Sequence, residues 1–250
     1  MNRYFIYLSY NGTLYHGWQR QPNVVTVQET LENALSTVLC QKIKITAAGR
    51  TDTGVHAEQM TAHFDFEEDF NAENLVASLN SLLPPNIAVQ RIIPVKPNVH
   101  ARFNALSRRY EYRITFEKNP FRQDTLCRMF SPGLDFEQMN RAAQKLFDYT
   151  DFTSFSKLHS DAKTNNCKIM RAEWTEKPEG WIFVIEANRF LRNMVRAIVG
   201  TLFDVGRGKM SVEEFCRIIE NKDRSLAGTS APALGLFLVK VEYPENLFLT

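Results

Sequence analysis

The spacing of hydrophobic and polar positions in the first hundred residues predicts alternating strands and helices. A run of Tyr, Phe and Ile over 3–10 favours a strand, and Asn11-Gly12 ends it. Helical spacing of apolar residues predicts one helix over 27–40 and another that stops at Pro84-Pro85. The second helix is marked by Leu75, Val76, Leu79 and Leu82. The other predicted elements are strands over 42–48, 58–66 and 87–95.

A similar order returns in the second half of the chain. Strands are predicted over 107–116, 168–176, 181–188 and 234–242. Asp135 with Gln138, and Ser211 with Glu214, are typical of helix starts, because their side chains cap the first turn. Between these helices, a strong helix carries its apolar side on Leu191, Met194, Val195, Ile198, Val199 and Leu202.

The order of predicted elements indicates an α+β fold. The first half reads β-α-β-β-α-β, which is the split, ferredoxin-like plan. We expect two related halves with antiparallel sheets side by side, helices packed on the sheet and an active-site cleft between the halves. The expected domains are 1–105, which carries the loop 49–57, and 106–250.

Composition is that of a globular protein, and charge is unevenly distributed. Hydrophobic residues make up 44% of the 250 residues, charged residues 23%, and the net charge is +2. Segments 100–130 and 188–209 are nonetheless rich in Arg and Lys, whereas 64–73 is acidic. The two basic segments could form one positive cleft if the fold brings them together, or they could be solvated surface charge.

Several classes of protein are disfavoured by what the chain contains. Cys40, Cys127, Cys167 and Cys216 form no CxxC pair, so we expect reduced thiols and neither a zinc site nor a disulfide framework. The five histidines, His16, His56, His63, His100 and His159, are too scattered to suggest metal ligands. The first residues turn polar too early for a signal peptide, and no apolar run approaches a membrane span. We therefore expect a cytoplasmic protein with no membrane association.

The candidate chemistry lies in the segment Ala47-Ala48-Gly49-Arg50-Thr51-Asp52-Thr53-Gly54-Val55-His56-Ala57. It joins two predicted strands and places a cation and a carboxylate between two glycines. Glycines permit unusual backbone angles or close approach of another backbone. Loops on a rigid sheet are common sites for catalytic groups. A surface loop with an Asp in a turn is the alternative that composition leaves open.

This segment resembles the signature of the TruA family of tRNA pseudouridine synthases. GRTDTGVHA matches the family's usual GRTDAGVHA except at Thr53. Four further segments resemble the family in the same order: YNGTLYHGWQRQP, HARFNALSRRYEYRI, NRFLRNMVRAIVGTL and GTSAPALGLFLVKVEYP. Thr150 in YTDFTSF stands where many members have His.

The resemblance implies a reaction, a substrate and a set of residues. It implies isomerisation of uridine to pseudouridine at positions 38, 39 and 40 of the tRNA anticodon arm, by a homodimer that uses no metal, nucleotide or redox cofactor. It implies that Asp52 is catalytic, that Arg50 fills the space left by the extruded uridine, that Tyr110 packs against the uracil and that Arg196 pairs with Asp52. Arg189, Arg192 and Arg196 are expected on one helical side, opposite the apolar stripe.

The chemistry is compatible with one carboxylate. Breaking the glycosidic bond places positive character on the ribose, and a carboxylate can stabilise that charge, attack as a nucleophile or remove a proton. Two alternatives remain. A non-catalytic RNA-binding protein fits the aromatic strands, and an Asp-dependent nucleoside or sugar hydrolase would need a second carboxylate, for which Glu58 is the nearest candidate.

Overall fold

The computed structural model describes residues 1–130, 133–157 and 164–249. The chain forms two compact units, Met1–Ser107 with Phe237–Thr250, and Arg108–Leu236. Each unit contains its own strands and helices, so the α+β class is confirmed. The division into domains at residue 105 stays a prediction. No helix in the described ranges is both long enough and apolar enough to span a bilayer.

The first unit has the predicted order of elements. It contains β1 (Asn2–Tyr10), α1 (Val27–Val38), β2 (Thr46–Ala47), β3 (His56–Phe66), α2 (Ala72–Leu82), β4 (Ile87–Val95), most of β9 (Leu236–Glu242) and a short 3-10 turn, η5 (Glu245–Leu247). β1 pairs antiparallel with both β3 and β4, and β9 adds to β3 in parallel. The sequence therefore predicted the split β-α-β-β-α-β plan correctly.

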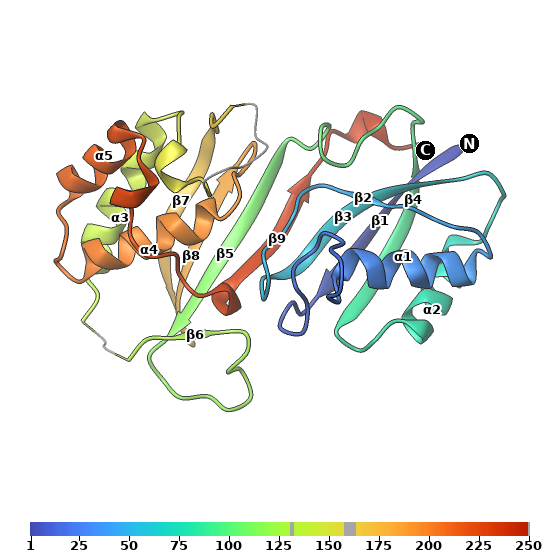
Figure 1. The fold of residues 1–250 in the computed structure, drawn as a ribbon, viewed down its shortest axis with the longest axis horizontal. Helices are drawn as coiled ribbons and strands as arrows, with labels where there is room; N and C mark the ends of the chain where they lie inside the picture. The colour runs from blue at the N-terminus through green and yellow to red at the C-terminus, as the bar shows by residue number, and fades with distance from the viewer. Residues whose placement is uncertain (131–132, 158–163, 250) are drawn as a thin grey trace. The chain divides into compact units, whose positions relative to one another are not determined.

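Polar side chains cap the first turns of α1 and α2. The Thr26 side chain accepts a hydrogen bond from Glu29 N, and that of Asn71 accepts one from Asn74 N, so each satisfies an amide that the helix leaves unpaired. α1 and α2 contact each other, and α2 packs on β4 (Figure 1). Alternate apolar side chains of β3, including Met60 and Phe64, are buried.

The strand expected over 42–48 is wrong except at its end, because only β2 (Thr46–Ala47) pairs with β3. Ile43 and Ile45 are still buried, so the alternation of side chains is real. Their amides bond to α1 instead of a strand: Ile43 N donates to Ser36 Oγ at 2.9 Å, and Ile45 N donates to Glu32 Oε1 at 3.1 Å. Side-chain acceptors on a helix have replaced a β partner.

The predicted second helix is confirmed as α2, but its buried side does not include its last residue. Leu82 is 50% exposed, whereas Leu83 is buried. Leu83 ends the helix in an extended conformation, with ψ at 147°. A residue that precedes proline avoids helical geometry, so Pro84 turns the chain there and Leu83 takes the inward position.

Residues 96–104 form a turn that several side chains of the first unit hold in place. His63 Nδ1 accepts a hydrogen bond from Ala101 N at 3.1 Å, and Tyr243 Oη donates to Ala101 O at 2.6 Å. Arg3 donates to Val99 O at 2.8 Å while it pairs with Asp65. Burial above all, followed by the charge of Arg3, lowers the pKa of His63 to about 4. His63 is therefore neutral at pH 7 and acts as a hydrogen-bond acceptor.

In the described residues, the second unit has an antiparallel arrangement of strands and three α-helices. Its elements are β5 (Ser107–Thr115), β6 (Cys127–Arg128), α3 (Phe136–Lys145), β7 (Ile169–Lys177), β8 (Gly180–Ala187), α4 (Met194–Gly206) and α5 (Val212–Asn221), with 3-10 turns η1 (Leu146–Asp148), η2 (Thr153–Phe155), η3 (Arg224–Leu226) and η4 (Ala233–Gly235). β8 pairs antiparallel with β5 and β7, and β6 adds to β5 in parallel. α3, α4 and α5 contact one another (Figure 1).

Two predicted helix starts in this unit are confirmed, and one is wrong. Asp135 accepts from Gln138 N, and Ser211 forms a complete capping box with Glu214. The arginine-rich helix, however, begins only at Met194, after Asn193 in a left-handed conformation with φ 65°. Arg189 and Arg192 therefore lie outside the helix and share no helical side with Arg196.

Candidate active site

The loop Ala48–Val55 joins β2 to β3 and carries Arg50 and Asp52. Gly54 has φ 77°, a left-handed conformation that glycine adopts at little cost, as its sequence position suggested. Gly49 is not in a left-handed conformation, and a Cβ there would meet nothing within 4 Å, so neither backbone angle nor close contact requires glycine at this position. The loop returns on itself through a hydrogen bond from Val55 N to Asp52 O at 3.1 Å.

The backbone of the segment 10–18 holds this loop in place. Trp18 N donates to Thr51 O at 3.1 Å, and Gly54 N donates to Tyr15 O at 3.3 Å. A Cβ on Gly17, which has φ 83°, would lie 2.5 Å from Thr51 O. The close approach of two backbones is therefore possible only because glycine stands at this position.

Three buried side chains link the same pair of segments. Tyr10 Oη and Thr51 Oγ1 share a hydrogen bond of 2.9 Å. Gly12 N donates to His56 Nδ1 at 3.1 Å, and the His56 ring stacks on Phe237 with ring centroids 4.5 Å apart. Tyr10, Thr51 and His56 are all under 10% exposed. The sequence reasoning missed these three residues, although YNGTLYHGW, with its two glycines, marked the segment that supports the loop.

The two charged residues of the loop differ in exposure. Arg50 is exposed and Asp52 is half-buried. Asp52 therefore lies next to buried Thr51 without being part of the main core. A carboxylate on a well-fixed backbone, with access to solvent, is suited to contact a substrate that enters from outside.

Tyr110 lies on β5 in the second unit, opposite Ile185 of β8. Its ring is half-buried and meets Phe190 edge-on, with centroids 5.2 Å apart and planes at 90°. This contact fixes the orientation of the ring. Alternate residues of a strand face the same side, so Tyr110 lies on the side of β5 that carries Tyr112.

Arg196 lies in the first turn of α4 and is tied to the segment 228–235. Its Nε donates to Ala231 O at 2.7 Å, and Ala231 N donates back to Arg196 O at 2.9 Å. Tyr112 Oη donates to Pro232 O, the next carbonyl, at 2.9 Å. Burial raises the pKa of Tyr112, and the positive charge of Arg196 acts against that rise. These contacts place Arg196 near the side of β5 that carries both tyrosines.

The predicted site residues are thus distributed over both units. Arg50 and Asp52 share one loop of the first unit, and Tyr110 and Arg196 lie in the second. In the basic segments, several cations already have acidic partners: Arg109 pairs with Glu186, Arg113 with Glu111, Arg122 with Glu179 and Arg207 with Asp204. The positive cleft stays a prediction.

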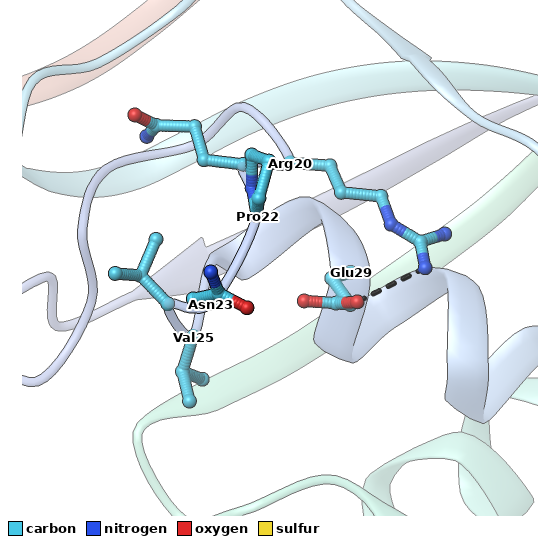
Figure 2. A pocket seen from close by; sticks show the side chains of 7 residues that line it. Arg20, Pro22, Asn23, Val25 and Glu29 are labelled. Carbon is cyan, nitrogen blue, oxygen red and sulfur yellow. Dashed lines mark ion pairs between the residues drawn. The ribbon is translucent and has the colours of Figure 1, made fainter.

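A hollow on the loop before α1 contains none of these residues. It is lined by residues 20–25 and Glu29 (Figure 2). Arg20 pairs with Glu29 at 3.1 Å and reaches Glu32 at 3.7 Å, so its charge is balanced within the first unit. Among the residues that the structure describes, no group of three or more His, Cys, Asp or Glu side chains is placed to hold a metal ion. His159 lies outside the described residues.

Comparison with known proteins agrees with the resemblance of the motifs. A family model described as tRNA pseudouridine synthase matches residues 6–104 and 142–244. "tRNA pseudouridine synthase A" of Bacteroides thetaiotaomicron is 58% identical over 252 residues, which cover 99% of this chain and 93% of that protein. The proteins of the same name from Bacteroides fragilis and Porphyromonas gingivalis are 57% and 54% identical, and each alignment covers at least 99% of both chains.

The chain belongs to the tRNA pseudouridine synthase family. The matched ranges include the loop Ala48–Val55, the segment 10–18 and α4. Among solved structures, the "Structure A of CRISPR endoribonuclease Cse3 bound to 19 nt RNA" matches at 12% identity with a TM-score of 0.22, over 83% of this chain and 97% of that one. That likeness carries no argument about this protein.

Proposed function

We propose that this protein isomerises uridine to pseudouridine at positions 38, 39 and 40 of the tRNA anticodon arm, with Asp52 as the catalytic residue. Membership of the family establishes the reaction class, an isomerase that forms pseudouridine in tRNA. The three positions rest on the resemblance of GRTDTGVHA and four further segments to the TruA family. The fixed, half-buried position of Asp52 is the observation that supports its role most directly.

The reaction needs a carboxylate and no change in oxidation state. Uracil leaves C1′ of the ribose, rotates and returns bonded through C5, and the C5 proton moves to the freed N1. While the glycosidic bond breaks, the Asp52 carboxylate attacks C1′, removes a proton from the sugar or stabilises the positive charge on the sugar. No second carboxylate is required, which separates this proposal from the hydrolase alternative.

Arg50, Tyr110 and Arg196 have distinct parts in the proposal. Arg50 is exposed, so it is free to enter the RNA and fill the space that the target uridine leaves on extrusion. Extruding a base costs on the order of a few kcal/mol. Tyr110 packs against the uracil, and such stacking contributes about 1–3 kcal/mol. Arg196 is the cation that pairs with the Asp52 carboxylate and orients it.

Nucleoside analysis tests the function. The protein is incubated with an unmodified tRNA transcript that has uridines at 38, 39 and 40, and the RNA is digested and mapped. Pseudouridine at these positions is the expected result. Free uracil would favour the hydrolase, and unchanged uridine with tight tRNA binding would favour the RNA-binding protein. Pseudouridine elsewhere would contradict the anticodon-arm assignment.

We further propose that the protein is a cytoplasmic homodimer in two domains, 1–105 and 106–250. The resemblance supports the dimer, and a tRNA substrate supports the location. Light scattering at micromolar concentration is expected to give twice the monomer mass. A stable monomer under those conditions would contradict the dimer.

A further inference from the structure

The contacts beneath the Asp52 loop point to a residue that serves the reaction without touching the RNA. Thr51, directly before Asp52, is held at two atoms. Its carbonyl accepts from Trp18 N at 3.1 Å, and its hydroxyl bonds to Tyr10 Oη at 2.9 Å. Together these bonds fix the peptide unit that leads to the Asp52 Cα. Thr51 and Tyr10 are 8% and 4% exposed, so water does not compete readily for their hydroxyls.

We propose that Tyr10 is a positioning residue, whose hydroxyl sets the place of the Asp52 carboxylate through Thr51. The inference rests on the proposed role of Asp52 and goes beyond it. Misplacing a reacting group by about 1 Å can cost about a hundredfold in rate. The hydrogen bond from Trp18 N fixes the Thr51 carbonyl, but by itself it would let the loop rotate about that one contact. The second hydrogen bond, between the Tyr10 and Thr51 hydroxyls, prevents this rotation.

A second tie acts at the other end of the loop. His56 Nδ1 accepts from Gly12 N at 3.1 Å, and Gly12 lies two residues after Tyr10. A Cβ on Gly12 would collide with Val55 O, so the backbones are in direct contact there. Asp52 is thus held between two buried side-chain bonds, one on each side of it, that reach the same short segment.

Paired substitutions separate positioning from general stability. Tyr10→Phe and Thr51→Val each remove a hydroxyl with little change of shape, whereas Thr51→Ser keeps the hydroxyl. Tyr243→Phe is the matched control: its hydroxyl bonds to Ala101 O at 2.6 Å in the same unit, away from the Asp52 loop. The kcat at saturating tRNA, the KM for tRNA and the Tm are measured for each variant.

The expected result is a loss in kcat of about tenfold for Tyr10→Phe and for Thr51→Val, which corresponds to about 1.4 kcal/mol. KM stays within about threefold, and Thr51→Ser keeps most of the rate. The double variant Tyr10→Phe/Thr51→Val is no slower than either single one, because all three lack the same bond. Tyr243→Phe lowers the Tm about as much as Tyr10→Phe does, but it leaves kcat unchanged.

Each other outcome overturns the proposal. Wild-type kcat in Tyr10→Phe would show that the hydroxyl does not position Asp52. Losses that multiply in the double variant would show that the two hydroxyls act separately. An equal loss of kcat in Tyr243→Phe would show that the rate simply follows stability. If the wild-type protein itself forms no pseudouridine, the proposed function fails, and that result is distinct from all of these.

Discussion

The Asp52 loop and the start of α4 each present a charged side chain from an irregular backbone, but different kinds of contact hold the two regions in place. Each contains a left-handed residue, Gly54 with φ 77° in the first and Asn193 with φ 65° in the second. Each is held by a separate segment, 10–18 or 228–235. In the loop, buried side chains bond to one another and to the backbone, as Tyr10 does to Thr51. At α4, the charged residue itself makes the tie, since Arg196 donates to Ala231 O.

Because of this difference, a substitution at Asp52 and a substitution at Arg196 should have different effects on the structure. The bonds of the Thr51 carbonyl and hydroxyl do not involve the Asp52 side chain, so Asp52 can be replaced while Thr51 keeps them. Arg196 is both the proposed functional cation and a structural donor. Its replacement therefore disturbs the segment 228–235 as well as any charge it supplies. We expect catalytic and structural effects to separate cleanly at the loop and to overlap at α4.

Asp52→Asn is expected to have the largest effect on the rate of pseudouridine formation, with little effect on stability. It keeps the size of the side chain and removes the charge. Losing electrostatic stabilisation alone costs about 10²–10³ in rate, and losing an essential nucleophile costs up to about 10⁶. The Tm should stay within a few degrees and tRNA affinity within about tenfold. A rate above about a tenth of wild type, measured by pseudouridine formation, would exclude Asp52 as the central group.

Arg196→Gln is expected to lower the rate about a hundredfold and also to lower the Tm. The charge is lost, and the neutral amide does not reproduce the planar donor that reaches Ala231 O. Arg141→Gln is the control, because Arg141 is an exposed helical arginine paired with Glu137. Both variants are assayed for turnover and thermal unfolding. An unchanged Tm with lost activity would mean that Arg196 resembles Asp52 and that the contrast between the two regions is wrong.

Tyr110→Ala is expected to weaken productive tRNA binding by about 5- to 150-fold, the equivalent of 1–3 kcal/mol of base stacking. Tyr110→Phe keeps the aromatic face and should retain most binding, although any part that the hydroxyl has in hydrogen bonding or proton transfer is lost. Affinity and turnover are measured for both. Wild-type turnover in Tyr110→Ala would assign the ring to packing against Phe190 alone.

A smaller effect is expected at the two left-handed residues. Gly54→Ala should cost about 1–2 kcal/mol of unfolding free energy, because a Cβ disfavours this conformation. Asn193→Gly relieves that strain but removes the 2.6 Å bond from Asn193 Nδ2 to Ser230 Oγ, so its net effect should be under about 1 kcal/mol. Urea unfolding of both variants measures the difference. Equal destabilisation would mean that conformation and side-chain bonding do not distinguish the two turns.

The sequence predicted the helices and strands better than the hydrogen bonds that connect them. Periodicity placed β4 (Ile87–Val95) at its observed bounds, and the capping residues marked α3 and α5. It failed where a backbone amide found an unexpected acceptor, as Ile45 N does in Glu32, because periodicity reports burial and not bonding partners. It failed again before α4, where the left-handed conformation of Asn193 marks the start of the helix although the helical spacing of apolar residues extends back to Leu191 in the sequence.

The site residues likewise include some that the sequence indicated and others that it did not. The motif around Asp52 was visible because two glycines flank a charged pair in a short segment. Tyr10 and His56 were not, because an isolated Tyr at a strand end resembles any core aromatic, and its bond to Thr51 spans 41 positions of the chain. Residues that act through contacts distant in sequence become visible only with coordinates.

The neutral imidazole of His63 makes the turn at 96–104 sensitive to acid. Its pKa of about 4 is below the ordinary 6.5, so the unfolded chain binds a proton more readily than the folded one between these values. Its contribution to stability is therefore complete above pH 6.5 and is lost as pH falls toward 4. A protonated His63 cannot accept from Ala101 N, and its charge would face Arg3 and His100, opposed only in part by Asp65. Hydrogen exchange at Ala101 should accelerate, relative to the intrinsic rate, from pH 7 to pH 4.5. Unchanged protection would show that the turn does not depend on this proton.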